Sequence, residues 1–128
     1  TVTLSKNKDR GDPGVFEKGN VSVVIEQGEC AQTVEEAAGK TGNYEFRVYA
    51  HMLITFSANS NFSQLLIKYS SHTEGTKTYY FDYEEMEGAT NDYDNSKYEA
   101  VVTLDSAAKE YSFVCWHQTR IASVEFFA

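Results

Sequence analysis

The side chains with the clearest capacity for chemistry in this sequence are flat aromatic rings set beside polar groups. The densest example is the run Tyr79-Tyr80-Phe81-Asp82-Tyr83. In an extended strand its rings point to both faces, so either Tyr80 or the pair Tyr79 and Tyr83 must lie away from the core. Sugar rings present apolar C–H faces that stack on such side chains, while carboxylate, amide and guanidinium groups bond their hydroxyls. The run therefore indicates a carbohydrate-binding surface, with an ordinary wet sheet surface as the alternative.

Four further residues are candidates for the same surface. Tyr93 lies in a long acidic segment, and Arg47 is expected on the polar side of its strand. Trp116 is the only tryptophan, and strand alternation places it on one face with Val114 and Gln118. A tryptophan in a sandwich is more often a core residue than a binding platform, so both interpretations stay open. The predicted ligand-binding residues are Trp116, Tyr80, Tyr83, Tyr79, Gln118, Arg47 and Tyr93.

The sequence holds no recognisable catalytic motif. No Gly-x-Ser-x-Gly turn occurs, and His51, His72 and His117 lack the spacing of metal ligands or of a catalytic triad. Paired carboxylates for glycoside hydrolysis meet in space and not along the chain, so a small acidic hydrolase remains a third hypothesis. We expect a protein that is not an enzyme.

Two clusters of oxygen-bearing side chains raise the question of calcium. They are Asn7, Asp9 and Asp12, and Asn91, Asp92, Asp94 and Asn95. Neither has the full spacing of an EF-hand loop, and such side chains usually bond their own backbone in turns. We therefore expect turns and no cofactor, with calcium as the alternative.

The two cysteines and the two glycosylation sequons leave alternatives open. Cys30 and Cys115 are either buried thiols or a bridge that closes most of the domain. The triplets beginning at Asn20 and Asn61 would be modified only in a eukaryotic secretory pathway, and such triplets arise often by chance.

Length and charge set the class of protein. The 128 residues fit one domain, and the formal charge of −8 disfavours nucleic acid and anionic lipid surfaces as partners. No apolar run approaches the roughly 20 residues that span a bilayer, so we expect no membrane insertion.

The elements that must position these residues are short β-strands. Residues 21–25, 44–48 and 98–104 alternate apolar and polar side chains with a period of two. Further strands are expected at 52–57, 63–69, 78–83, 110–117 and 120–127, with a short one at 1–4. One or two helical turns are expected within 32–39, and 84–96 is the longest irregular segment. This pattern predicts one all-β domain over residues 1–128, an antiparallel β-sandwich of jelly-roll or immunoglobulin-like type.

Several runs follow one another in a characteristic order. They are Gly19-Asn20-Val21-Ser22-Val23-Val24-Ile25, Phe46-Arg47-Val48-Tyr49-Ala50, Leu53-Ile54-Thr55-Phe56-Ser57, Leu65-Leu66-Ile67-Lys68-Tyr69 and Arg120-Ile121-Ala122-Ser123-Val124-Glu125-Phe126. Over residues 19 to 127 the chain resembles a β-sandwich accessory domain of secreted and lipid-anchored surface proteins of gut Bacteroidota. Cys30 and the sequence Cys115-Trp116-His117 depart from that pattern, which leaves ligand and partner open.

The resemblance implies an extracellular or cell-surface module, within a larger multidomain protein, that carries no catalytic residues. Together with the surplus aromatic residues, it predicts a non-catalytic module that binds a glycan or polysaccharide. The alternative is a structural spacer or a protein-interaction and adhesion module, whose contacts would lie on strand edges and flat faces. Fold alone does not decide between them, since function belongs to sites.

Overall fold

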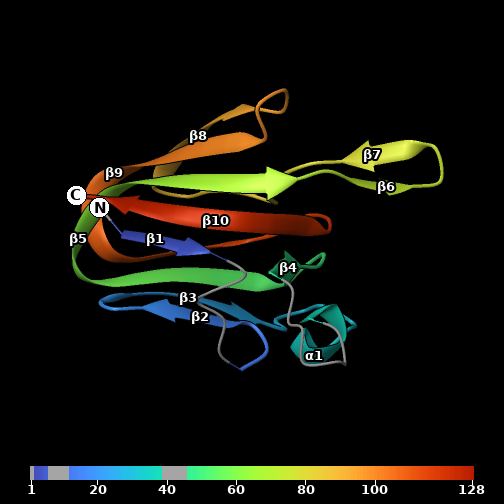
Figure 1. Cartoon of the computed structure of the whole chain (residues 1–128), viewed down its shortest axis with the longest axis horizontal. Helices are drawn as coiled ribbons and strands as arrows, with labels where there is room; N and C mark the ends of the chain where they lie inside the picture. The colour runs from blue at the N-terminus through green and yellow to red at the C-terminus, as the bar shows by residue number, and fades with distance from the viewer. Residues whose placement is uncertain (1, 6–11, 39–45) are drawn as a thin grey trace.

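The computed structural model describes residues 2–5, 12–38 and 46–128, which form an antiparallel β-sandwich (Figure 1). The strands are β1 (Val2–Ser5), β2 (Val15–Lys18), β3 (Val21–Glu26), β4 (Arg47–Val48), β5 (Leu53–Ser70), β6 (His72–Glu74), β7 (Lys77–Tyr79), β8 (Ala89–Asp94), β9 (Glu99–Val114) and β10 (Thr119–Phe127). The helix is α1 (Val34–Ala38). The predicted fold class is therefore confirmed, and the first strand, β1, pairs with the last, β10.

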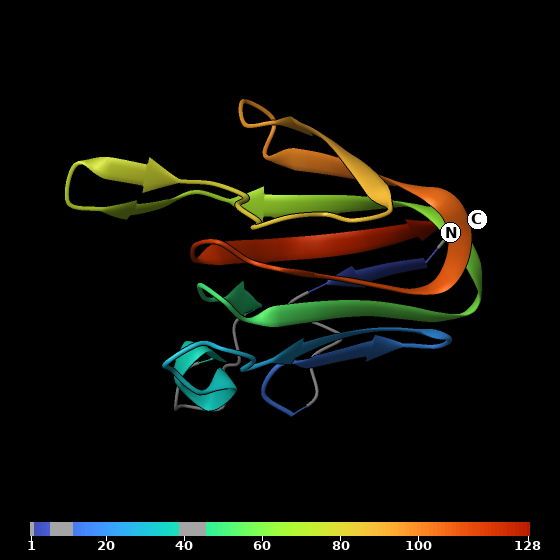
Figure 2. The same cartoon turned by 180° about the vertical axis from the view of Figure 1, so that it is seen from behind.

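Two long, bent strands join the two layers of the sandwich. The first part of β5, Leu53 to Ser57, pairs with the end of β9, whereas Gln64 to Lys68 pairs with its beginning. The register shifts between Ser57 and Gln64, where both strands turn. Figure 2 shows this bend at the end of the molecule where the two termini lie. One continuous hydrogen-bonded sheet thus folds over onto itself.

Each layer follows from these pairings. One layer has the order β8, first half of β9, second half of β5, β10. Strands β4 and β1 follow one another along the outer edge of β10. The other has the order β2, β3, first half of β5, second half of β9. The sequence predicts separate strands at 52–57 and 63–69, and again at 98–104 and 110–117. These predictions were wrong in one respect, because each pair is one bent strand.

Aromatic rings from both layers form the core. Phe56 of β5 lies 5.7 Å from Phe113 and 6.4 Å from Phe126, measured between ring centroids. Phe126 of β10 also meets Phe62 edge-on at 5.2 Å. The alternation of β3, in which Val21, Val23 and Ile25 are buried, continues this core to the edge of the second layer. Period-two burial is the physical reason that these segments are strands.

The helix α1 is short and firmly capped. The Thr33 hydroxyl accepts the Glu36 amide at 3.2 Å, and the Glu36 carboxylate accepts the Thr33 amide at 3.3 Å, which is a capping box. Gly14 packs beneath it, since a Cβ there would lie 2.5 Å from Cγ1 of Val34. No helix within residues 2–5, 12–38 and 46–128 is long and apolar enough to cross a membrane.

The hairpin of β6 and β7 projects from the sandwich at the end opposite the termini (Figure 1). The strand predicted at 78–83 ends already at Tyr79, because the following segment packs onto the sandwich and does not pair with another strand. Phe81 is buried, and the Asp82 amide donates to the Thr119 hydroxyl at 3.3 Å.

The segment 84–96, expected to be irregular, contains β8. Strands β2 and β6 were not predicted from the sequence. In the strand expected at 44–48, residues 44 and 45 lie outside the described residues, as does Gly39 after α1.

Candidate functional site

A groove beside the projecting hairpin gathers four of the predicted binding residues. Its aromatic lining comprises Tyr79, Tyr80, Tyr83, Tyr93 and Phe81. Its polar lining comprises Lys77, Thr78, Asp82 and Asn95. We call this hollow, which has a volume of about 490 Å³, the tyrosine groove.

Three elements position the groove. Strand β7 carries Tyr79, the irregular segment after it carries Tyr80 and Tyr83, and β8 carries Tyr93. The irregular segment is anchored by Phe81, whose ring lies 5.6 Å from Tyr69 and 5.8 Å from Phe113. The groove is therefore built on buried contacts, although much of its lining lies outside regular strands.

The turn after β8 forms the opposite wall. One Asp94 carboxylate oxygen accepts the Ser96 amide at 2.9 Å and the Ser96 hydroxyl at 2.6 Å, and these bonds lower the pKa of Asp94. The Asn95 side-chain oxygen accepts the Tyr69 hydroxyl at 2.7 Å. Burial, together with the nearby Asp94, raises the pKa of Tyr69 to about 12. Asp94 thus makes the turn bonds that the sequence predicts.

Calcium was the alternative to turns for the two clusters of oxygen-bearing side chains. Among the described residues no three His, Cys, Asp or Glu side chains are grouped closely enough to hold a metal ion. Asn7 and Asp9 of the other candidate cluster lie outside the described residues.

Tyr79 separates the groove from a smaller neighbouring hollow. Its ring is stacked on the His117 imidazole, with centroids 3.6 Å apart and planes 3° from parallel. The Lys77 ammonium lies 5.0 Å from the same ring centroid, which is a cation–π distance. The His72 ring is also near, with its centroid 6.5 Å from that of Tyr79 and the planes 27° apart. The Tyr79 ring is therefore already in contact with its neighbours, whereas Tyr93, 54% exposed, offers the most open ring of the groove.

The remaining predicted residues lie apart from the groove lining. Gln118 lines the neighbouring hollow together with Tyr49 and His117. Arg47 pairs with Arg120 through β4 and β10 and is half-buried. Trp116, 59% exposed, lies in the turn after β9, and its ring centroid is 6.2 Å from that of His51, with the two planes 81° apart. The core interpretation of Trp116 is therefore wrong, because β9 ends at Val114 and strand alternation stops there.

The polar groove residues were only partly visible in the sequence. Asp82 lies inside the aromatic run, and Lys77 and Thr78 directly precede it. The position of the run in the sequence therefore indicated that these residues lie near the site. Asn95 was a candidate only for a turn or, as the alternative, for a calcium site.

The two cysteines are free thiols. Both Cys30 and Cys115 are buried, so the bridge that the sequence left open is not formed. Burial raises the pKa of the Cys115 thiol to about 12.

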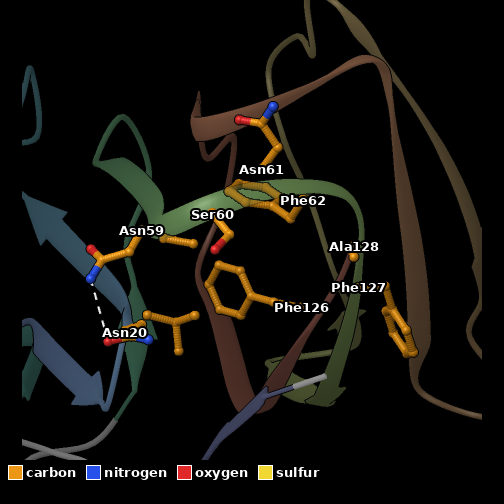
Figure 3. Close-up of a pocket in the computed structure, with 10 residues that line it drawn as sticks. Asn20, Asn59, Ser60, Asn61, Phe62, Phe126, Phe127 and Ala128 are labelled. Carbon is orange, nitrogen blue, oxygen red and sulfur yellow. Dashed lines mark hydrogen bonds between the residues drawn. The ribbon is translucent and has the colours of Figure 1, made fainter.

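A second hollow lies at the opposite end of the sandwich, beside the C-terminus (Figure 3). We call it the terminal hollow. Asn20 and Asn59 face each other across its rim, with the Asn59 amide nitrogen 3.3 Å from the Asn20 side-chain oxygen. The rings of Phe62 and Phe126 point into it, whereas the ring of Phe127 points away (Figure 3). Both sequon asparagines, Asn20 and Asn61, are exposed there. None of the predicted binding residues lines it.

The geometry of the tyrosine groove suits recognition of a polar ligand with apolar faces. It combines an open phenol ring with an ammonium, a carboxylate, an amide and hydroxyl groups. Comparison of the chain with protein-family models, with curated proteins and with solved structures found no match.

Proposed function

We propose that this domain binds carbohydrate at the tyrosine groove without catalysing a reaction. The observation that carries the proposal is the meeting of Tyr80, Tyr83 and Tyr93 with Asp82 and Asn95 in one hollow. A flat polar surface at this end of the sandwich would have favoured a structural spacer instead.

Each part of the groove matches a property of a sugar ring. The exposed Tyr93 ring can stack on an apolar C–H face of the sugar. The Asp82 carboxylate accepts hydroxyl protons, whereas Lys77 donates to hydroxyl oxygens and the Asn95 amide does both. Lys77 and Asp82 balance each other in charge, so the groove suits a neutral, hydroxyl-rich ligand better than a phosphate or another strong anion.

The lining argues against hydrolysis. Glycosidases of the common kinds place two carboxyl groups on either side of the scissile bond. In the part of the chain that the structure describes, Asp82 is the only carboxylate that lines the groove. We therefore assign the groove to binding alone.

The setting of the domain is part of the same proposal. The resemblance to accessory domains of Bacteroidota surface proteins supports an extracellular or cell-surface location within a larger protein. The competing proposal is a spacer or adhesion module, and free strand edges favour it. Within the described residues β8 pairs only with β9 and β2 only with β3, so β8 and β2 each have one unpaired edge. Free edges can pair with another chain.

Affinity gel electrophoresis tests the proposal. We expect the native domain to be retarded by at least one of a panel of soluble neutral polysaccharides, comprising xylan, mixed-linkage glucan, galactomannan, xyloglucan and starch. Tyr93→Ala should weaken binding about tenfold, the effect of losing roughly 1.4 kcal/mol of stacking. Phe127→Ala, which removes an aromatic ring beside the terminal hollow at the other end of the sandwich (Figure 3), should leave retardation unchanged.

Two results would contradict the proposal. Migration of the native domain unaffected by every polysaccharide would remove carbohydrate as the ligand and favour the interaction module. Equal retardation of the Tyr93→Ala and native domains would place the ligand elsewhere on the molecule.

A further inference from the structure

Trp116 is the most exposed large hydrophobic side chain in the described part of the molecule. It lies in the turn between β9 and β10, at the end of the sandwich opposite the termini (Figure 1). A single exposed hydrophobic residue is ordinary on a protein surface. What sets Trp116 apart is how firmly its surroundings hold it.

The backbone beside Trp116 is fixed on both sides. The Cys115 amide donates to the Met52 carbonyl at 3.0 Å, and the His51 amide donates to the Cys115 carbonyl at 2.8 Å. On the other side, His117 is stacked on Tyr79 at 3.6 Å. The indole is therefore attached to a turn whose position is already set before a ligand arrives, which reduces the entropy lost on binding.

His51 reaches its place beside the indole at a conformational cost. Its φ is +69°, in the left-handed region that a residue with a Cβ seldom adopts. Gly28 lies against it so closely that a Cβ at position 28 would be 2.9 Å from the His51 carbonyl oxygen. Strained positions of this kind cluster at functional sites.

A carboxylate orients the His51 ring. Its Nδ1 lies 2.7 Å from a carboxylate oxygen of Glu84, and the Glu84 amide donates to the Val114 carbonyl at 2.9 Å. With Nδ1 bonded to Glu84, Nε2 of His51 remains to bond a ligand hydroxyl. Trp116, His51 and Glu84, which we call the Trp116 patch, thus offer a ring face, an imidazole and a carboxylate from three segments of the chain.

The Trp116 patch adjoins the tyrosine groove through two direct chain connections. Trp116 precedes His117, which is stacked on the groove residue Tyr79. Glu84 follows the groove residue Tyr83. The groove and the patch therefore lie next to each other along the chain at Tyr83 and Glu84, and the proposal below takes a ligand that extends out of the groove to reach the patch.

We propose that the Trp116 patch is a second carbohydrate subsite, which binds a further sugar residue of the same chain that occupies the tyrosine groove. This inference rests on the proposed function. It makes the ligand an oligosaccharide or polysaccharide whose length spans both places, and not a monosaccharide.

The lone tryptophan makes this subsite directly observable. We would hydrolyse the polysaccharide that retards the native domain, fractionate the products by length, and titrate each into the protein while recording tryptophan fluorescence. Short oligosaccharides should bind the groove without changing the emission. Longer ones should shift the emission to the blue and bind about tenfold more tightly, the effect of one added stacking contact of roughly 1.4 kcal/mol.

Two variants separate recognition from folding. Trp116→Ala should bind long oligosaccharides about tenfold more weakly than the native domain and short ones equally well, as measured by calorimetry. His51→Gly removes the imidazole while relieving the positive φ, so it should weaken long oligosaccharides alone and leave thermal stability unchanged or higher. Tyr93→Ala should weaken oligosaccharides of every length.

The outcomes distinguish this inference from the proposed function. A native domain that binds oligosaccharides with no emission change at any length, and with full affinity in Trp116→Ala, overturns the second subsite and leaves the groove intact. A native domain that binds no polysaccharide overturns both.

Discussion

Replacing Phe56 with alanine should lower the free energy of unfolding by about 3–5 kcal/mol, the range for removing a large buried aromatic side chain. Phe56 is fully buried on the first half of β5. Its ring contacts Phe113 of β9 and Phe126 of β10, so the cavity would open between the two layers. Urea denaturation followed by circular dichroism measures the change.

The neighbouring residue supplies a matched control. Thr55 is on the same strand but on its other, half-buried face, and Thr55→Ala should cost less than about 1 kcal/mol, as substitutions away from the core usually do. A Phe56→Ala protein as stable as the Thr55→Ala protein would contradict the packing of the two layers around this ring.

Stability should fall steeply in alkaline solution. Burial raises the pKa of Cys115 from 9.0 to about 12 and that of Tyr69 from 10.0 to about 12. Both groups lose their protons at lower pH in the unfolded chain than in the folded domain. Rising pH therefore stabilises the unfolded state, and the free energy of unfolding decreases. The stabilising contribution of the protonated Cys115 thiol is fully present below pH 9 and is lost between pH 9 and pH 12. The total loss is up to about 4 kcal/mol, at 1.36 kcal/mol for each pKa unit.

A cysteine variant isolates that contribution. We expect Cys115→Ala to be less stable near pH 7, because it leaves a small cavity, but to lose less stability than the native domain between pH 9 and pH 11. Urea titrations at a series of pH values measure how the free energy of unfolding of each protein changes with pH. Equal slopes for the two proteins would mean that the Cys115 thiol ionises as readily in the folded state as in the unfolded chain.

The sequence predicts the strands because local alternation of apolar and polar residues follows burial. Val21, Val23 and Ile25 were expected on one face of a strand, and they are buried on one face of β3. The bend in β5 was not predictable in the same way. The polar residues between Ser57 and Phe62 look like a turn between two strands, and only the partner strand β9, which bends with it, shows that one strand continues.

The candidate site was predictable where its residues lie together in the sequence. The aromatic run from Tyr79 to Tyr83 supplies most of the groove lining. Asn95 could not be assigned to it, because its orientation depends on the hydroxyl of Tyr69, 26 positions away in the chain. Trp116 was expected within a strand at 110–117 because alternation was extended past Val114, where the strand ends, and only the core interpretation of this residue was wrong.

Binding of carbohydrate in the tyrosine groove is most directly tested by mapping amide chemical shifts. Uniformly ¹⁵N-labelled domain would be titrated with oligosaccharides from the polysaccharide that retards it. We expect the largest shifts at residues 77–83 and at Tyr93 and Asn95. Shifts confined to the terminal hollow, at Asn20 and residues 59–62, would contradict the account.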